Sequence, residues 1–112
     1  MSESERVTVE PVKHIRVALG GQTVAETTHG YVIHERGLSD RYYVPRADVR
    51  AELASGVGAG TCPWKGEWQH LDVTLGETRV ANGAWTYFTT KPVTDVTKDF
   101  IAFYDTKFEI TT

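Results

Sequence analysis

Short stretches in which apolar and polar residues alternate cover much of the chain, and this period of two predicts β-strands with one buried face. Residues 14–19 alternate before the Gly20-Gly21 pair, and residues 22–27 and 31–34 alternate after it. A glycine pair between two alternating stretches is typical of a tight hairpin turn, because glycine adopts positive φ readily. We therefore expect short antiparallel strands joined by hairpin turns.

The hairpin pattern recurs 56 residues later in the chain. Seven residues of the first hairpin region have an identical partner at this offset: His14, Val17, Leu19, Gly20, Val24, Ala25 and Tyr31. About one identity is expected by chance at average residue frequencies. Internal duplication explains the match, and convergence of two hairpins on a similar composition is the alternative. We predict an all-β, mainly antiparallel domain with two similar β-meander halves, about residues 14–61 and 70–112, packed as a small sandwich or roll.

The segment between the halves predicts one short helix near residues 46–54. Pro45 fixes a φ that suits a first helical turn, and Val49 and Leu53 are four residues apart, as on one helix face. The glycine-rich residues 54–60 should end this helix. They are read as a flexible linker rather than a phosphate-binding loop, because no Gly-Lys-Ser/Thr ending follows.

Length, charge and cysteine content narrow the class of protein. The 112 residues fit one small domain, which we place at residues 6–112 after a disordered tail over residues 1–5. A formal net charge of −3 gives no electrostatic attraction to nucleic acid or to an anionic membrane. The chain has no apolar run near the roughly 18 residues of a membrane span. A lone cysteine, Cys62, excludes an internal disulfide and a multi-cysteine zinc site. We expect a cytoplasmic protein without metal or cofactor.

Four motifs occur in order along the chain: Arg41-Tyr42-Tyr43-Val44-Pro45-Arg46-Ala47-Asp48-Val49, Thr61-Cys62-Pro63-Trp64-Lys65-Gly66, Ala84-Trp85-Thr86-Tyr87 and Ala102-Phe103-Tyr104. Together they resemble domain-of-unknown-function family 427, a group of small, mainly bacterial, β-rich proteins, over about residues 6–111. Glu35 falls at the position of a glutamate in this family, and Trp64 stands where many relatives have tyrosine. The resemblance implies a fold more than an activity. The family sometimes carries a nucleotidyltransferase label, but this chain lacks the Asp-x-Asp pair typical of that chemistry.

Glu35 and Lys65 are the predicted catalytic residues. Lys65 lies three residues after Cys62, where an ammonium would favour the thiolate, and a desolvated lysine can itself act as a base or nucleophile. Cysteine is also often a small buried hydrophobe. Glu35 ends a predicted strand and should meet Lys65 at the seam between the halves. The pair is then either an acid/base pair or a structural salt bridge.

Arginine and aromatic residues near the same seam suggest a binding surface. Arg41 and Tyr43 share one strand face, so Arg41 could clamp a carboxylate or phosphate; alternatively Tyr43 is core and Arg41 reaches solvent. Trp85 and Tyr87 also share a face, and they either line a pocket or fill the core. The predicted substrate-binding residues are Arg41, Tyr43, Cys62, Trp64, Trp85 and Tyr87.

These observations predict a small-molecule ligand in a cleft between the halves. If the protein is an enzyme, the residue types favour cofactor-independent acid/base chemistry, such as elimination, isomerisation or cyclisation. The alternative from a different class is a non-catalytic binding or interaction module, or a homodimer joined through an edge strand. Nucleotidyl transfer is a third, less favoured function.

Overall fold

The structure is a computed structural model that describes residues 6–112, so the expected disordered tail over residues 1–5 lies outside the described residues. Strands make up most of the described chain. Its elements are β1 (Val7–Val12), β2 (Ile15–Leu19), β3 (Gln22–Thr27), β4 (Gly30–Glu35), β5 (Arg41–Val44), η1 (Arg46–Asp48), β6 (Glu52–Cys62), β7 (Gly66–Leu75), β8 (Thr78–Thr90), η2 (Pro92–Thr97), β9 (Ile101–Phe103) and β10 (Glu109–Thr111). No helix within this part of the chain is long and apolar enough to cross a membrane.

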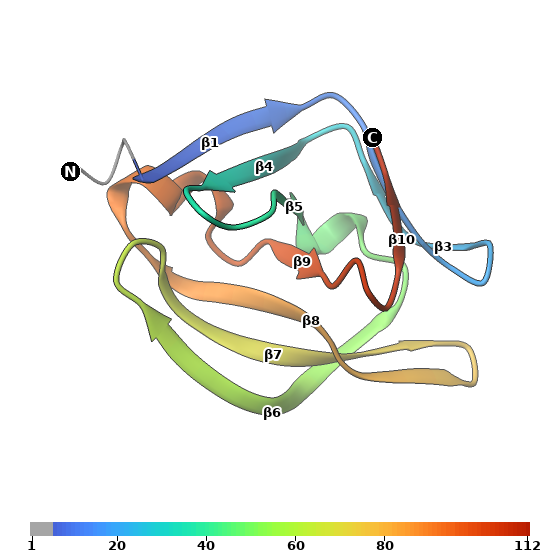
Figure 1. Cartoon of the computed structure of the whole chain (residues 1–112). Helices are drawn as coiled ribbons and strands as arrows, with labels where there is room; N and C mark the ends of the chain where they lie inside the picture. The colour runs from blue at the N-terminus through green and yellow to red at the C-terminus, as the bar shows by residue number, and fades with distance from the viewer. Residues whose placement is uncertain (1–5) are drawn as a thin grey trace.

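The strands form two antiparallel sheets, which confirms the all-β prediction. A seven-stranded sheet has the order β1-β4-β5-β9-β8-β7-β6, and a three-stranded sheet has the order β10-β2-β3. The large sheet curls strongly, so that β1 and β4 lie opposite β6, β7 and β8, with β5 and β9 between them (Figure 1). The turn after β4 and the turn between β6 and β7 therefore face each other at one end of the molecule, on the left of Figure 1.

The two predicted halves share both sheets, because β4 to β6 join β7 to β9 in the large sheet and β10 pairs with β2 in the small one. Tyr43 of β5 pairs with Ala102 of β9, and Trp85 of β8 pairs with the same residue from the other side. Each repeated sequence does form an antiparallel hairpin, β2–β3 and β7–β8, with its turn at Gly20 or at the equivalent Gly76. The duplication itself stays a prediction.

The helix expected near residues 46–54 is much shorter in the structure. Only Arg46–Asp48 is helical, as a 3-10 turn, and the chain becomes strand β6 at Glu52. Val49 forms a β-bridge with Ala25 and so leaves no room for a continuing helix. The glycine-rich segment, expected to be a flexible linker, lies inside β6 and pairs with β7 on both sides of a bulge between Ser55 and Ala59.

Buried residues form two clusters, one between the sheets and one toward the curled end. The first cluster is aliphatic with two phenylalanines and includes Ile15, Val17, Val24, Val44, Leu71, Val73, Ile101, Phe103 and Phe108. The second is more aromatic and contains Val7, Ile33, Tyr43, Trp85, Tyr87 and Ala102. Its aromatic side chains reach from the core to the end where the two turns face each other.

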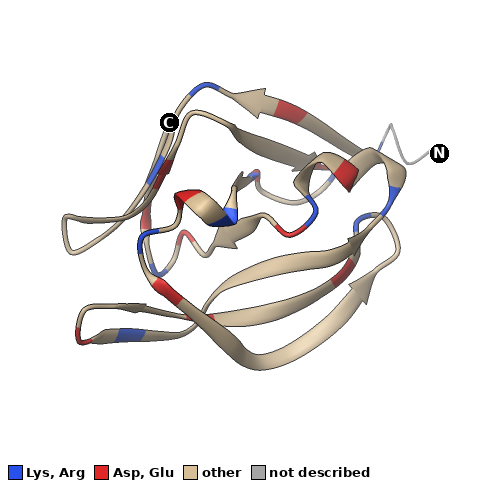
Figure 2. Ribbon diagram, turned by 180° about the vertical axis from the view of Figure 1, so that it is seen from behind, with Lys and Arg blue, Asp and Glu red and all other residues tan. Residues whose placement is uncertain are grey.

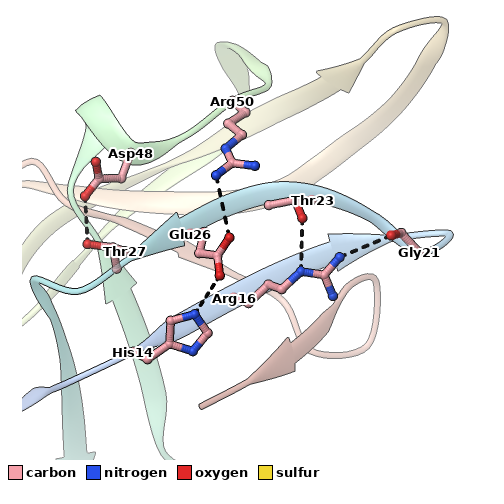
Figure 3. Close-up of polar contacts among 8 residues, drawn as sticks. All are labelled: His14, Arg16, Gly21, Thr23, Glu26, Thr27, Asp48 and Arg50. Atoms are coloured by element: carbon pink, nitrogen blue, oxygen red, sulfur yellow. Dashed lines mark hydrogen bonds and ion pairs between the residues drawn. The ribbon is translucent and has the colours of Figure 1, made fainter.

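Polar contacts hold the small sheet to the 3-10 turn that precedes β6. Thr27 Oγ1 donates to Asp48 Oδ2 at 2.7 Å, while Glu26 contacts His14 at 2.6 Å and Arg50 at 3.5 Å (Figure 3). The hydrogen bond from His14 lowers the pKa of the Glu26 carboxyl. Elsewhere acidic and basic residues are interspersed along the chain rather than gathered on one element (Figure 2), in keeping with the small net charge.

Candidate functional site

A cavity of about 180 Å³ opens at the curled end of the sheet. Its walls come from β4, the β4–β5 turn, β5, the β6–β7 turn, β7, β8 and the residue after β9. The lining residues are Ile33, Glu35, Leu38, Ser39, Arg41, Lys65, Trp68, Trp85, Tyr87 and Tyr104. Five of the eight predicted site residues are in this set: Glu35, Arg41, Lys65, Trp85 and Tyr87.

Glu35 and Lys65 meet in this cavity although they are 30 positions apart in the chain. Lys65 Nζ lies 2.6 Å from Glu35 Oε1, and the two side chains are only 10% and 11% exposed. That carboxylate oxygen is fully covered, and the ammonium is its one close polar partner within the described chain. Because little water reaches the pair, its electrostatic attraction is screened far less than in a surface ion pair.

Local structure holds Lys65 in this place. Its backbone N–H donates to Cys62 O at 3.3 Å, closing a tight turn, and its carbonyl accepts a hydrogen bond from the buried Thr94 hydroxyl at 2.9 Å. The next residue, Gly66, has φ of +124°, and a Cβ there would lie 2.0 Å from the Thr89 carbonyl oxygen. Only glycine fits, which explains the Lys-Gly sequence at the turn.

Glu35 is the last paired residue of strand β4. It lies opposite Val7 in the β1–β4 ladder, and its side chain extends from the strand end over the cavity. Two residues earlier, Ile33 lies on the same face of β4 and is buried in the aromatic cluster. The strand alternation therefore aims Glu35 toward the interior rather than toward solvent.

Aromatic rings make most of the remaining wall. Trp68 pairs with Tyr87 across β7 and β8, which places both rings on one face. The ring centroids of Trp85 and Tyr104 are 4.5 Å apart, and Lys65 Nζ lies 5.6 Å from the centre of the Tyr87 ring. An ammonium at this distance is attracted by the ring face.

The two buried tyrosines act as protonated hydroxyls. Burial raises the pKa of Tyr43 and of Tyr87 far above the ordinary value for tyrosine. Tyr43 is fully buried and lies behind the wall, where its hydroxyl accepts the Trp85 indole N–H at 3.2 Å. Tyr43 therefore supports Trp85 from behind and does not line the cavity. This is the alternative in which Tyr43 belongs to the core.

Two other predicted binding residues also lie outside the cavity lining. Cys62 and Trp64 pack against the outside of the aromatic cluster, and both are partly buried. The Arg6 guanidinium lies over the Trp64 ring, 4.3 Å from its centre. The Cys62 side chain is close enough to Tyr87 to contribute, after burial, to the raised pKa of that hydroxyl.

Arg41 lies at the mouth of the cavity, on β5. Its guanidinium carbon is 5.5 Å from the centre of the Trp85 ring, and its nearest carboxylate is Asp105 at 3.9 Å. Its side chain is 32% exposed and that of Asp105 is 57% exposed. The arginine thus faces both the cavity and solvent.

Sequence reasoning missed half of the lining: Ile33, Leu38, Ser39, Trp68 and Tyr104. Tyr104 ends one of the ordered motifs, so motif membership was an available signal. Behind it, His70 Nε2 lies 2.8 Å from the Tyr104 hydroxyl, and His70 Nδ1 lies 3.0 Å from the Val57 carbonyl oxygen. A carbonyl can only accept, so Nδ1 carries a proton, and in the neutral imidazole Nε2 then accepts from the Tyr104 hydroxyl.

A second, more open depression lies near the small sheet, around His14, Glu26, His29, Asp48 and Arg50. Its polar groups largely bond to one another, as Figure 3 shows for His14 with Glu26 and for Thr27 with Asp48. Across residues 6–112, no three His, Cys, Asp or Glu side chains are grouped as ligands for a metal ion.

Comparison with known proteins identifies the family. No curated protein matches the sequence. The family model described as "Domain of unknown function (DUF427)" matches residues 8–112, and its short label carries the nucleotidyltransferase name. The match includes every residue that lines the Glu35–Lys65 cavity, so the chain belongs to this family of unknown function.

Proposed function

We propose that the protein binds a small planar organic molecule in the Glu35–Lys65 cavity and transfers a proton to and from it. The observation that carries this proposal is a nearly buried carboxylate–ammonium pair, 2.6 Å apart, that borders an aromatic-walled cavity. Structural ion pairs do not need an adjacent cavity. Pairs of acidic and basic groups in a cleft are the usual arrangement for acid/base chemistry.

The reaction class that fits these groups is proton abstraction next to a carbonyl, as in isomerisation or elimination. The Glu35 carboxylate removes a proton from carbon, the C–H electron pair moves to form an enolate, and the Lys65 ammonium stabilises the enolate oxygen. Returning the proton to a different atom gives isomerisation, and expelling a β-substituent gives elimination. Neither step needs a cofactor.

Hydrogen–deuterium exchange on phenylpyruvate tests this proposal. Its ring suits the aromatic walls, and its methylene protons are acidic because they lie next to a ketone. We expect the native protein in D₂O to accelerate exchange of these protons above the buffer rate. The double variant Glu35→Gln/Lys65→Met, which keeps shape and neutrality, should lose at least about 100-fold of that acceleration.

The matched control is Arg50→Gln, which removes an exposed arginine outside the cavity lining. It should exchange phenylpyruvate at the native rate. Exchange at the buffer rate in native protein would contradict proton transfer. Equal acceleration by the native protein and by the double variant would contradict the assignment to Glu35 and Lys65.

A non-catalytic module that dimerises through an edge strand is the second candidate. Strand β6 ends the seven-stranded sheet and carries Val57, whose side chain is 82% exposed. The bulge between Ser55 and Ala59 interrupts its ladder, and bulges oppose edge-to-edge pairing. Light scattering, combined with the phenylpyruvate exchange measurement, distinguishes the two candidate functions. A tight dimer that does not accelerate exchange favours the non-catalytic module. We also propose a cytoplasmic location, which a single cysteine supports.

A further inference from the structure

Three charged side chains line the cavity, and their charges do not cancel. Glu35 and Lys65 neutralise each other at 2.6 Å. Arg41 is the third, and it adds one positive charge to the lining. The lining residues contain no second carboxylate to balance it.

The contacts of Arg41 leave its hydrogen-bonding capacity largely unused. Its ion pair with Asp105 has a nitrogen–oxygen distance of 3.9 Å, which is too long for a hydrogen bond, and Asp105 is mostly exposed. Among the described residues, none forms a hydrogen bond with the guanidinium, whose ring contact is with Trp85. A guanidinium has five N–H donors in a flat fork that matches a carboxylate.

The size and walls of the cavity limit the body of the ligand. Its volume of about 180 Å³ is slightly above that of an engineered cavity of about 150 Å³ that binds benzene. Trp85 and Tyr104, with ring centroids 4.5 Å apart, offer a rigid aromatic wall next to Arg41. A single ring with a short polar substituent fits this space.

We propose that the ligand of this cavity is a small aromatic carboxylate, whose carboxylate binds Arg41 and whose ring lies against Trp85 and Tyr104. This inference rests on the proposed function, because it assigns a substrate class to the same cavity. Arg41 is then the residue that selects anionic ligands, and the Glu35–Lys65 pair lies deeper, beside the atoms of the ligand that react.

Two probes of nearly equal shape test the charge requirement. Benzoate is an anion, and benzamide is its neutral counterpart. In NMR titrations that follow the indole N–H signals of Trp68 and Trp85, we expect native protein to bind benzoate about 10-fold more tightly than benzamide. Added salt should weaken benzoate binding and leave benzamide binding unchanged.

Variants of Arg41 test the recognition residue. Arg41→Gln should reduce benzoate affinity about 10-fold, to the level of benzamide, and Arg41→Lys should give an intermediate affinity because it keeps the charge but loses the fork. Arg50→Gln is the control and should bind both probes like the native protein. The salt series on native protein tests the same point independently of how the variants fold.

Each outcome decides one question. If benzamide binds as tightly as benzoate, or if Arg41→Gln leaves benzoate affinity unchanged, the anion inference is overturned while the cavity remains a binding site. If neither probe shifts the indole signals, the carboxylate inference and binding of small aromatic molecules in this cavity fail together. Tighter binding of benzoate that depends on Arg41 and on salt supports the inference.

Discussion

The contact between Glu35 and Lys65 joins a strand end to a tight turn and removes two charges from water. Both side chains are about nine-tenths covered. Desolvation of each charge is unfavourable, and the attraction between them offsets that loss only while both are present. The pair is therefore a sensitive position for stability, whether or not it also transfers protons.

Single and double substitutions separate the desolvation of each charge from the attraction between the two charges. Glu35→Gln leaves the Lys65 ammonium buried without its partner, and Lys65→Met leaves the carboxylate in the same condition. Each should lower the free energy of unfolding by about 3 kcal/mol. The double variant should lie within about 1 kcal/mol of native, because no buried charge remains unpaired.

Urea denaturation of the four proteins measures this coupling. The two single variants need a native-like circular dichroism spectrum at zero denaturant for the comparison to hold. Additive losses in the double variant would contradict a directly coupled pair. Losses below about 0.5 kcal/mol in both single variants would mean that water reaches the site and screens the charges.

The contacts of His34 make the stability of the folded protein depend on pH. Its Nδ1 lies 2.7 Å from Asp40 Oδ1, and its Nε2 lies 3.7 Å from Glu10 Oε2. The hydrogen bond to Asp40 raises the pKa of His34 above its ordinary value of 6.5, and partial desolvation opposes this. Asp40 precedes Arg41, so protonated His34 ties down the turn that carries part of the cavity wall.

The sign of this effect follows from the raised pKa. Protonated His34 stabilises the folded state fully below the ordinary histidine pKa, and the stabilisation is lost as pH rises through the raised value. The difference in melting temperature between native protein and His34→Gln should be larger near pH 5.5 than near pH 8.5. It should correspond to less than about 1 kcal/mol, because the groups are exposed. A difference that grows toward high pH would contradict this account.

At the scale of elements, one residue of β8 links irregular positions in the ladders of β6, β7 and β8. Asn82 of β8 has φ of +50°. Its side-chain Oδ1 accepts from Val57 N–H at 2.9 Å, and its Nδ2 donates to Val57 O at 2.8 Å. Its own N–H donates to Asp72 Oδ1, which is the largest cause of the lowered pKa of Asp72. The side chain of Asn82 thus ties β8 to the bulge of β6 across the intervening strand β7, and its backbone N–H adds a bond to β7.

Substitution of Asn82 tests this role. Asn82→Gly keeps the positive φ and loses both amide hydrogen bonds, so we expect a loss of about 1–2 kcal/mol. Asn82→Ala loses the same bonds and adds strain at positive φ, for about 1 kcal/mol more. Thermal denaturation should rank native above the glycine variant and the glycine variant above the alanine variant. Equal stability of the native protein and the glycine variant would contradict a stabilising role for the Asn82 side chain.

Sequence alternation predicted the strands well, but the glycine-rich part of β6 shows where local pattern is insufficient. Its glycines suggested a flexible linker, yet a Cβ at Gly60 would lie 2.8 Å from the Trp68 indole. That glycine serves a close approach between strands. The contact depends on the register of β6 with β7, which no local window contains. The short helix was overpredicted for a similar reason, since Val49 pairs with Ala25 of the small sheet.

At the scale of the whole molecule, one continuous sheet brings to the site residues that lie as far apart in the sequence as Ile33 and Tyr104. Glu35 and Lys65 were predictable as neighbours because Glu35 ends a strand, Lys65 lies in the Thr-Cys-Pro-Trp-Lys-Gly motif, and both positions were expected at the seam between the halves. Leu38 and Ser39 were not, because they lie in an exposed turn without periodicity. Tyr43 was predicted to bind the ligand, but its side chain packs in the aromatic cluster behind Trp85.

Chemical-shift mapping of phenylpyruvate binding tests the central claim that the Glu35–Lys65 cavity is the functional site. We expect the signals of the Glu35 carboxyl carbon, the Lys65 ammonium and the Trp85 indole to shift together with one dissociation constant. Signals of His14, Glu26 and Arg50 in the second depression should stay unchanged. Shifts confined to that depression, or no shift at the cavity residues, would contradict the account.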